Sequence, residues 1–83
     1  MAKSPNPAKP RLVRLSEAAL LADVSTSTLE YYIMIGLVRP IRPPGKRARF
    51  FDARLIERIR LIRRLNRSGY TLGDIRQTWL RRR

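Results

Sequence analysis

The chain has 83 residues, enough for one small domain, and a formal net charge of +13 from 19 Lys and Arg against 6 Asp and Glu. It contains no Cys and no His, which excludes disulfides and the usual zinc ligands and removes two common catalytic side chains. The carboxylates are scattered at helix caps and among arginines rather than paired for acid–base chemistry, so we expect no enzyme activity, no cofactor and no metal site.

The charge favours a nucleic-acid partner. Of the 19 cations 16 are Arg, whose planar guanidinium binds phosphate through two parallel hydrogen bonds and stacks on bases. A generic cationic protein at a membrane surface or on the ribosome is the alternative, because charge alone names no partner. No apolar run approaches the roughly 20 residues that cross a bilayer, and no signal peptide opens the chain. We therefore expect a cytoplasmic protein without a membrane partner.

The first ten residues differ in composition from the rest. They read MAKSPNPAKP, with three prolines, two lysines and almost no large apolar side chain, so they cannot form a packed core. We expect residues 1–10 to be a flexible basic tail and residues 11–83 to form the folded domain. Residues 11–15 (RLVRL) alternate charged and apolar side chains, which predicts a short extended segment.

Residues 16–35 carry the pattern of two short helices. Ser16 is expected to cap the first helix, which ends at a turn over residues 23–24. Ser25 is expected to cap a second helix that ends before Gly36. Two short helices joined by a tight turn predict a helix-turn-helix motif.

A proline-rich stretch follows the second helix. Residues 37–51 (LVRPIRPPGKRARFF) contain three prolines, which exclude a helix. Apolar ends flank a Pro-Gly turn, so we expect a two-stranded hairpin with a basic tip. The tip carries Arg42, Lys46 and Arg47. Strand alternation puts Arg49 and Phe51 on the same side of the hairpin as Arg47.

The third predicted helix spans residues 53–67 and is capped by Asp52. Its apolar face consists of Leu55, Ile56, Ile59, Ile62 and Leu65. Another face carries four arginines at spacings of i, i+3, i+4 and i+7, namely Arg60, Arg63, Arg64 and Arg67. This arginine stripe is either a solvated face or a contact for phosphate or an acidic partner. We adopt the second interpretation, with Arg63 and Arg67 as its contacts.

Ser68 and Gly69 end that helix, and Thr71 with Asp74 forms a T-x-x-D capping box that opens a fourth helix. Trp79 on its apolar face is expected to be a core or small interface residue and not a base-stacking one. The predicted fold class is therefore mainly α, with four helices plus a small two-stranded β wing.

These motifs resemble the N-terminal winged helix-turn-helix DNA-binding domain of the MerR family of bacterial transcription regulators. The resemblance covers about residues 15–79. The run from turn to wing matches at Val24, Ser25, Thr28, Leu29, Tyr31, Tyr32, Gly36, Leu37, Val38 and Pro40. Arg49 follows nine residues after Pro40, as the Arg of the family's wing motif does, and Phe51 stands where the family has Tyr. Residues 56–62 match the helix after the wing, and residues 69–72 (GYTL) match the turn into the next helix.

The resemblance implies how the domain meets DNA. The second helix, about residues 25–35, enters the major groove, and the wing, about residues 41–51, lies on the backbone. Ser25, Thr28 and Tyr31 would contact DNA and Arg49 would hold a phosphate, which agrees with the affinity of a helix N-terminus for phosphates and base edges. The complete set of expected DNA contacts is Ser25, Thr26, Ser27, Thr28, Tyr31, Tyr32, Arg42, Lys46, Arg47, Arg49, Arg63 and Arg67.

Three positions depart from the family pattern: Ala48 replaces the usual Tyr of the wing, Ile33 a usual Glu, and Glu30 an Arg that touches the backbone. Three roles for Glu30 stay open. It could form a capping box with Ser27 or stabilise the positive end of the helix, with no role in DNA binding. It could pair with a neighbouring Arg and orient it toward phosphate, or it could accept a hydrogen bond from a cytosine amino group. The family's long dimerisation helix and effector-binding region are missing, so the sequence is either a piece of a longer protein or a stand-alone domain.

Sequence-specific binding of double-stranded DNA by a nucleoid-associated transcription regulator is the function that these features favour. A single module binds weakly alone, so we expect a homodimer or cooperative side-by-side copies on DNA. Contact with RNA polymerase is a further partner that the resemblance allows. Two alternatives stay open: an architectural or recombination factor similar to phage excisionases, and a basic adaptor that binds RNA or an acidic protein.

Overall fold

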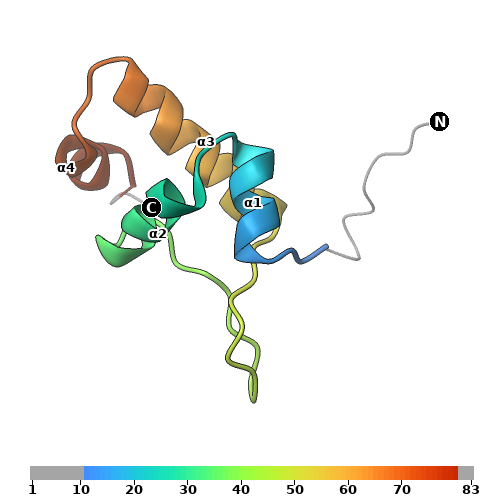
Figure 1. Ribbon diagram of the computed structural model, residues 1–83. Coiled ribbons are helices and arrows are strands. Elements are labelled where there is room, and N and C mark those ends of the chain that lie inside the picture. Colours follow the sequence, from blue (N-terminus) through green and yellow to red (C-terminus); the bar gives the residue numbers. More distant parts are fainter. Residues whose placement is uncertain (1–10, 81–83) are drawn as a thin grey trace.

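Four helices form the body of the domain, in the predicted order. The computed structural model describes residues 11–80, with side chains described up to residue 78, so the predicted tail and the role of Trp79 lie outside the described residues. The helices are α1 (Leu15–Ala22), α2 (Thr26–Met34), α3 (Ala53–Arg67) and α4 (Leu72–Asp74), which a π-helical turn, η1 (Ile75–Leu80), continues. In Figure 1, α1 packs against both α2 and the long helix α3, and the chain turns back after α3 so that η1 packs against α3. The mainly α fold class is thereby confirmed.

Local side chains set three of the helix starts, as predicted. The Ser25 hydroxyl accepts a hydrogen bond of 3.0 Å from the backbone of the first turn of α2. The Asp52 carboxylate does the same for α3 at 2.9 Å. Thr71 and Asp74 cap α4 reciprocally at 3.0 and 3.3 Å. These bonds satisfy backbone donors that a helix start otherwise leaves unpaired.

The start of α1 differs from the prediction. The N-cap residue is Arg14, no side chain among the described residues caps the helix, and Ser16 lies inside the first turn, so its expected capping role was wrong. The cause lies in the segment before the helix. Val13 exchanges two backbone hydrogen bonds of 3.0 and 2.8 Å with Phe51, which fixes the extended chain up to Val13. The turn into the helix therefore comes at Arg14, two residues before Ser16.

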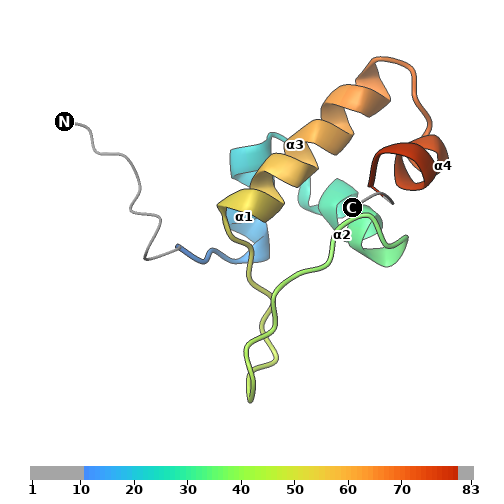
Figure 2. The same ribbon diagram turned by 180° about the vertical axis from the view of Figure 1, so that it is seen from behind.

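The wing projects from the helical body as a long loop in both views (Figure 1, Figure 2). Its arms are joined by one antiparallel bridge, in which Ile41 and Phe50 exchange two backbone hydrogen bonds of 2.8 Å. The tip is a turn closed by a 3.1 Å bond from Lys46 to Pro43, with Gly45 at φ 79°. The expected two-stranded ladder is not present within residues 11–80. Prolines in the first arm lack the N–H donors that further ladder bonds need.

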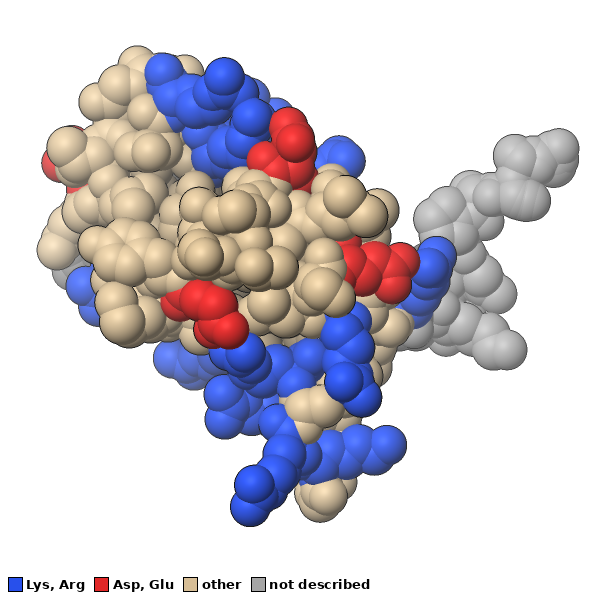
Figure 3. Space-filling view, in the orientation of Figure 1, with Lys and Arg blue, Asp and Glu red and all other residues tan. Residues whose placement is uncertain are grey.

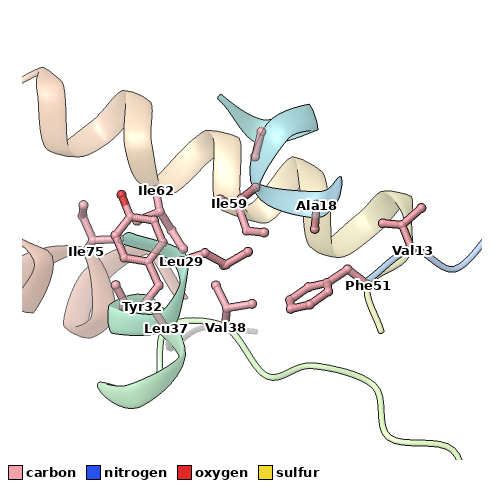
Figure 4. Close-up of a cluster of buried hydrophobic side chains, with 12 residues drawn as sticks. Val13, Ala18, Leu29, Tyr32, Leu37, Val38, Phe51, Ile59, Ile62 and Ile75 are labelled. Carbon is pink, nitrogen blue, oxygen red and sulfur yellow. The ribbon is translucent and has the colours of Figure 1, made fainter. Parts of the chain in front are cut away.

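The core lies where the helices and the base of the wing meet (Figure 4). Its buried members are Val13, Ala18, Ala19, Ala22, Leu29, Tyr32, Leu37, Val38, Phe51, Ile59, Ile62 and Ile75. The predicted apolar face of α3 is confirmed, since Ile59 and Ile62 are fully buried and the other three members pack against the core. Within residues 11–80 the helices lack the length and apolar character needed to span a membrane.

Candidate nucleic-acid interface

The first turn of α2 carries four consecutive hydroxyls, and the structure divides them into two pairs. Ser25 and Thr28 hydrogen-bond each other, since the Ser25 hydroxyl donates to the Thr28 hydroxyl at 2.9 Å while capping the helix. Thr26 and Ser27 are exposed at the positive end of the helix dipole. Because Ser25 is the N-cap, Ser27 stands inside the helix, so the capping box with Ser27, one of the roles left open for Glu30, is not formed.

The two tyrosines of α2 have different environments. Tyr31 is exposed on the outer face of the helix, together with Met34. Tyr32 points into the core and only 4% of its surface is exposed. Burial raises the pKa of the Tyr32 hydroxyl, and the nearby Arg63 charge opposes that shift. The structure therefore gives Tyr32 a packing role, and almost none of its side chain is available to a DNA molecule.

The wing tip presents cations and little else. Arg42, Lys46 and Arg47 are exposed, and no hydrogen bond or ion pair ties their side chains to other residues within 11–80. Figure 3 shows Lys and Arg over the projecting wing and, separately, along α3. The surface between these two basic areas, over α1 and α2, is mostly uncharged and carries isolated carboxylates.

Arg49 of the wing is held by Glu30 of α2. The Arg49 Nη1 and Nη2 atoms donate to the two carboxylate oxygens of Glu30, both at 2.9 Å. The Arg49 side chain is 28% exposed and that of Glu30 50%. The sequence offered an Arg partner as one of three roles for Glu30, and the structure provides that partner. Two parallel charge-assisted bonds are the most directional form of this pair.

The pair makes the Glu30 carboxyl more acidic. Its hydrogen bonds to Arg49 hold the pKa of Glu30 below the usual value of 4.5. The contact is therefore complete above that value and is lost as pH falls through the lowered pKa. We expect an NMR titration of the Glu30 carboxyl to show a midpoint below 4.5, which Arg49→Ala returns toward the usual value. Arg11→Ala is the control, because Arg11 pairs with Glu17 at 3.1 Å and does not touch Glu30. An unchanged midpoint in Arg49→Ala would contradict the observed contact.

The arginine stripe of α3 both holds the end of α1 and lines a hollow on the surface. Arg60 donates to the Leu21 carbonyl at 3.0 and 3.3 Å, and Arg63 pairs with Asp23 at 3.2 Å. Both contacts fix the end of α1, where helix carbonyls lack partners. Together with Arg64 and Arg67 these residues line a hollow beside the turn between α1 and α2. The stripe is thus partly structural, which spacing along one helix could not reveal.

A second hollow near the wing base was not predicted from the sequence. Arg39, Arg54 and Arg58 line it, beside the capping residue Asp52. Arg58 is anchored by a 2.8 Å bond from its Nε to the Leu37 carbonyl. The available signal was the placement of Arg39 and Arg54 just outside the two ends of the wing. Within residues 11–80 no group of three metal-ligating side chains comes together.

Solved structures of MerR family regulators are similar to this chain in fold and sequence. A search of curated proteins found no match. One similar solved structure is a MerR family transcriptional regulator from Bacillus cereus, with a TM-score of 0.75 and 27% identity over 88% of this chain and 55% of that one. Another is HiNmlR, a MerR family regulator lacking the sensor domain and bound to promoter DNA, with a TM-score of 0.72 and 25% identity over 81% of this chain and 51% of that one.

This chain therefore spans about half the length of these two structures. The sequence model of the MerR HTH family regulatory proteins matches residues 13–80, which includes all four helices and the wing. That family consists of regulators rather than enzymes, in agreement with the expectation from the sequence. The chain belongs to the MerR family of helix-turn-helix regulatory proteins.

Proposed function

We propose that this chain binds double-stranded DNA at specific sequences and regulates transcription, with α2 in the major groove and the wing on the backbone. The observation that carries the proposal is the exposed first turn of α2, whose free hydroxyls lie between two basic areas. A related regulator has been solved on promoter DNA, which supports a duplex as the partner. Two basic flanks around a helix that itself carries no Lys or Arg suit a partner with phosphates on both sides of a groove.

Base reading is assigned to the outer face of α2. Thr26 and Ser27 have free hydroxyls, and Tyr31 adds an exposed phenol one turn further on. Ser25 and Thr28 hold each other, so their part is to fix the helix start, while the backbone N–H groups of Thr26 and Ser27 between them can face a phosphate. Tyr32 is left out of the interface because it is buried.

Phosphate binding is assigned to the wing and to α3. Arg42, Lys46 and Arg47 form the wing part of the interface, and Arg49 joins them at its base. On α3, Arg67 is exposed, whereas Arg63 contributes from its pair with Asp23. Each cation that meets a phosphate releases a counterion, so affinity should fall steeply with salt.

The bound state is expected to contain more than one copy. A single module of this kind buries only about 600–1,000 Å² on DNA, so homodimers or side-by-side copies are needed for useful occupancy. Contact with RNA polymerase and residence on the nucleoid in the cytoplasm belong to the same proposal.

Selection from random duplex DNA, followed by sizing of the bound complex, tests the function. We expect one enriched motif and a complex of at least two copies. Enrichment of no motif, together with tighter binding to single-stranded RNA, would overturn the proposal in favour of a basic RNA-binding adaptor.

Tyr31→Ala tests the assignment of base reading. We expect it to weaken binding to the selected site by about 1–3 kcal/mol and to relax preference at one base position. The salt dependence should stay unchanged, because no phosphate contact is removed. Leu20→Ala, at an exposed position on α1 and outside the outer face of α2, is the control and should leave base preference unchanged. A uniform loss across all sequences would assign Tyr31 to the backbone instead.

A further inference from the structure

We propose that Glu30 is a positioning residue, which fixes Arg49, and with it the wing, against α2. In this position Arg49 binds Glu30 and a DNA phosphate at the same time. The inference rests on the proposed function, since it names how the wing is held for the backbone. It assigns a favourable role to a carboxylate on the face turned toward a polyanion.

The hydrogen-bond geometry leaves Arg49 a free edge. A guanidinium has five N–H donors arranged on three edges. Glu30 occupies the end edge, through Nη1 and Nη2. The Arg49 Nε and the remaining hydrogens have no hydrogen-bond partner within residues 11–80. The side edge formed by Nε and Nη2 can therefore take two oxygens of a phosphate while the carboxylate stays in place.

Beyond the Ile41–Phe50 bridge, the wing depends on this pair for its connection to the helices. Its arms share one backbone bridge, Ile41 with Phe50, and its tip one turn bond. Within the described chain, the two Arg49–Glu30 hydrogen bonds are the only side-chain hydrogen bonds from residues 42–49 to a helix. Without the Arg49–Glu30 contact, residues 42–49 would move about the Ile41–Phe50 bridge, and the tip cations would no longer keep a fixed distance from α2.

Removal of Glu30 should change DNA affinity in opposite directions if the carboxylate only repels phosphates and if it positions Arg49, so the sign of the change distinguishes the two roles. An exposed carboxylate near DNA repels phosphates, so its removal should strengthen binding if Glu30 is a bystander. If Glu30 positions Arg49, its removal should weaken binding instead. An exposed ion pair contributes little to folding, so the unfolding midpoint should stay nearly unchanged in either case.

The test is a double-mutant cycle on a short mixed-sequence duplex, with dissociation constants measured across salt concentrations. At about 0.1 M salt one phosphate contact is worth about eight-fold in affinity. We expect Arg49→Ala to lose about that factor and Glu30→Ala to lose at least about two-fold. In the Arg49→Ala background, Glu30→Ala should be neutral or strengthen binding, because nothing is left to position. Glu30→Ala that strengthens binding in both backgrounds overturns the inference.

Two matched variants serve as controls. One tests the effect of losing an exposed carboxylate elsewhere, and the other tests the effect of the positive charge at residue 49 without the guanidinium. Glu17→Ala removes a carboxylate that is 45% exposed and also paired with an Arg, but one that lies on α1; it should leave binding unchanged or slightly stronger. Arg49→Lys keeps the charge but cannot bridge two anions through separate edges. It should keep the salt slope and lose the sensitivity to Glu30→Ala.

Backbone relaxation of the free protein gives a readout that needs no DNA. Glu30→Ala should increase the motion of residues 42–49 while α1 to α3 stay rigid, and unchanged wing motion overturns the positioning role. Wild-type protein that binds no duplex would overturn the proposed function and the phosphate half of this inference together. Wild-type binding that Glu30→Ala strengthens overturns the inference alone.

Discussion

Shortening Leu29 to Ala should lower the free energy of unfolding by about 2–5 kcal/mol, the usual cost of removing a fully buried Leu side chain. Leu29 lies on the inner face of α2 and is 0% exposed, in the centre of the core (Figure 4). Domains of this size have only about 5 kcal/mol of stability. Leu29→Ala should therefore leave only about 0–3 kcal/mol, so that at the upper end of the loss about half of the protein is unfolded at room temperature and DNA binding falls in proportion.

Urea unfolding followed by circular dichroism measures the effect, and the chain supplies a matched control. Leu20→Ala removes the same atoms from a helix, but Leu20 is 78% exposed on α1. We expect that substitution to change stability by less than about 0.5 kcal/mol. Equal losses for the two variants would mean that the core is not built around α2 as the structure places it.

The parts of the fold that could be predicted from the sequence are those set by neighbouring residues. Ser25, Asp52 and Thr71 cap helices through bonds to backbone three residues away, and such bonds are visible in sequence. The start of α1 was missed because it depends on Val13 pairing with Phe51, which lies 38 residues further along the chain. A two-stranded ladder was predicted from the alternating pattern of the second arm of the wing. It does not form because the prolines of the first arm lack the N–H donors that a ladder needs.

The candidate site shows the same limit. Hydroxyls at the start of α2 and cations in the wing follow from local pattern, and the structure exposes most of them. Which of them are already occupied is a tertiary property. The pairs Arg63–Asp23 and Arg49–Glu30 join segments far apart in sequence. The burial of Tyr32 depends on core residues from other elements, among them Ile75 of η1. Two adjacent tyrosines therefore could not be assigned to different roles from the sequence.

Replacing the three wing-tip cations together, in Arg42→Ala/Lys46→Ala/Arg47→Ala, should weaken binding to any duplex by about 500-fold at about 0.1 M salt. Each lost phosphate contact removes about 0.9 from the slope of log affinity against log salt, so three contacts flatten it by about 2.7 and cost about eight-fold each. The side chains have no partners within residues 11–80, so the unfolding midpoint should not fall.

The charge-preserving variant Arg42→Lys/Arg47→Lys separates charge from geometry. If the wing acts on the backbone through its charge, this variant keeps the full salt slope and most of the affinity, because Lys also binds phosphate as a point charge. Equal loss of affinity in both variants would mean that the guanidinium forks read something more directional than phosphate charge. An unchanged slope in the triple variant would remove the wing tip from the interface, and the counterion release would then have to come from α3. Fluorescence anisotropy with labelled duplex, at a series of salt concentrations, distinguishes these outcomes.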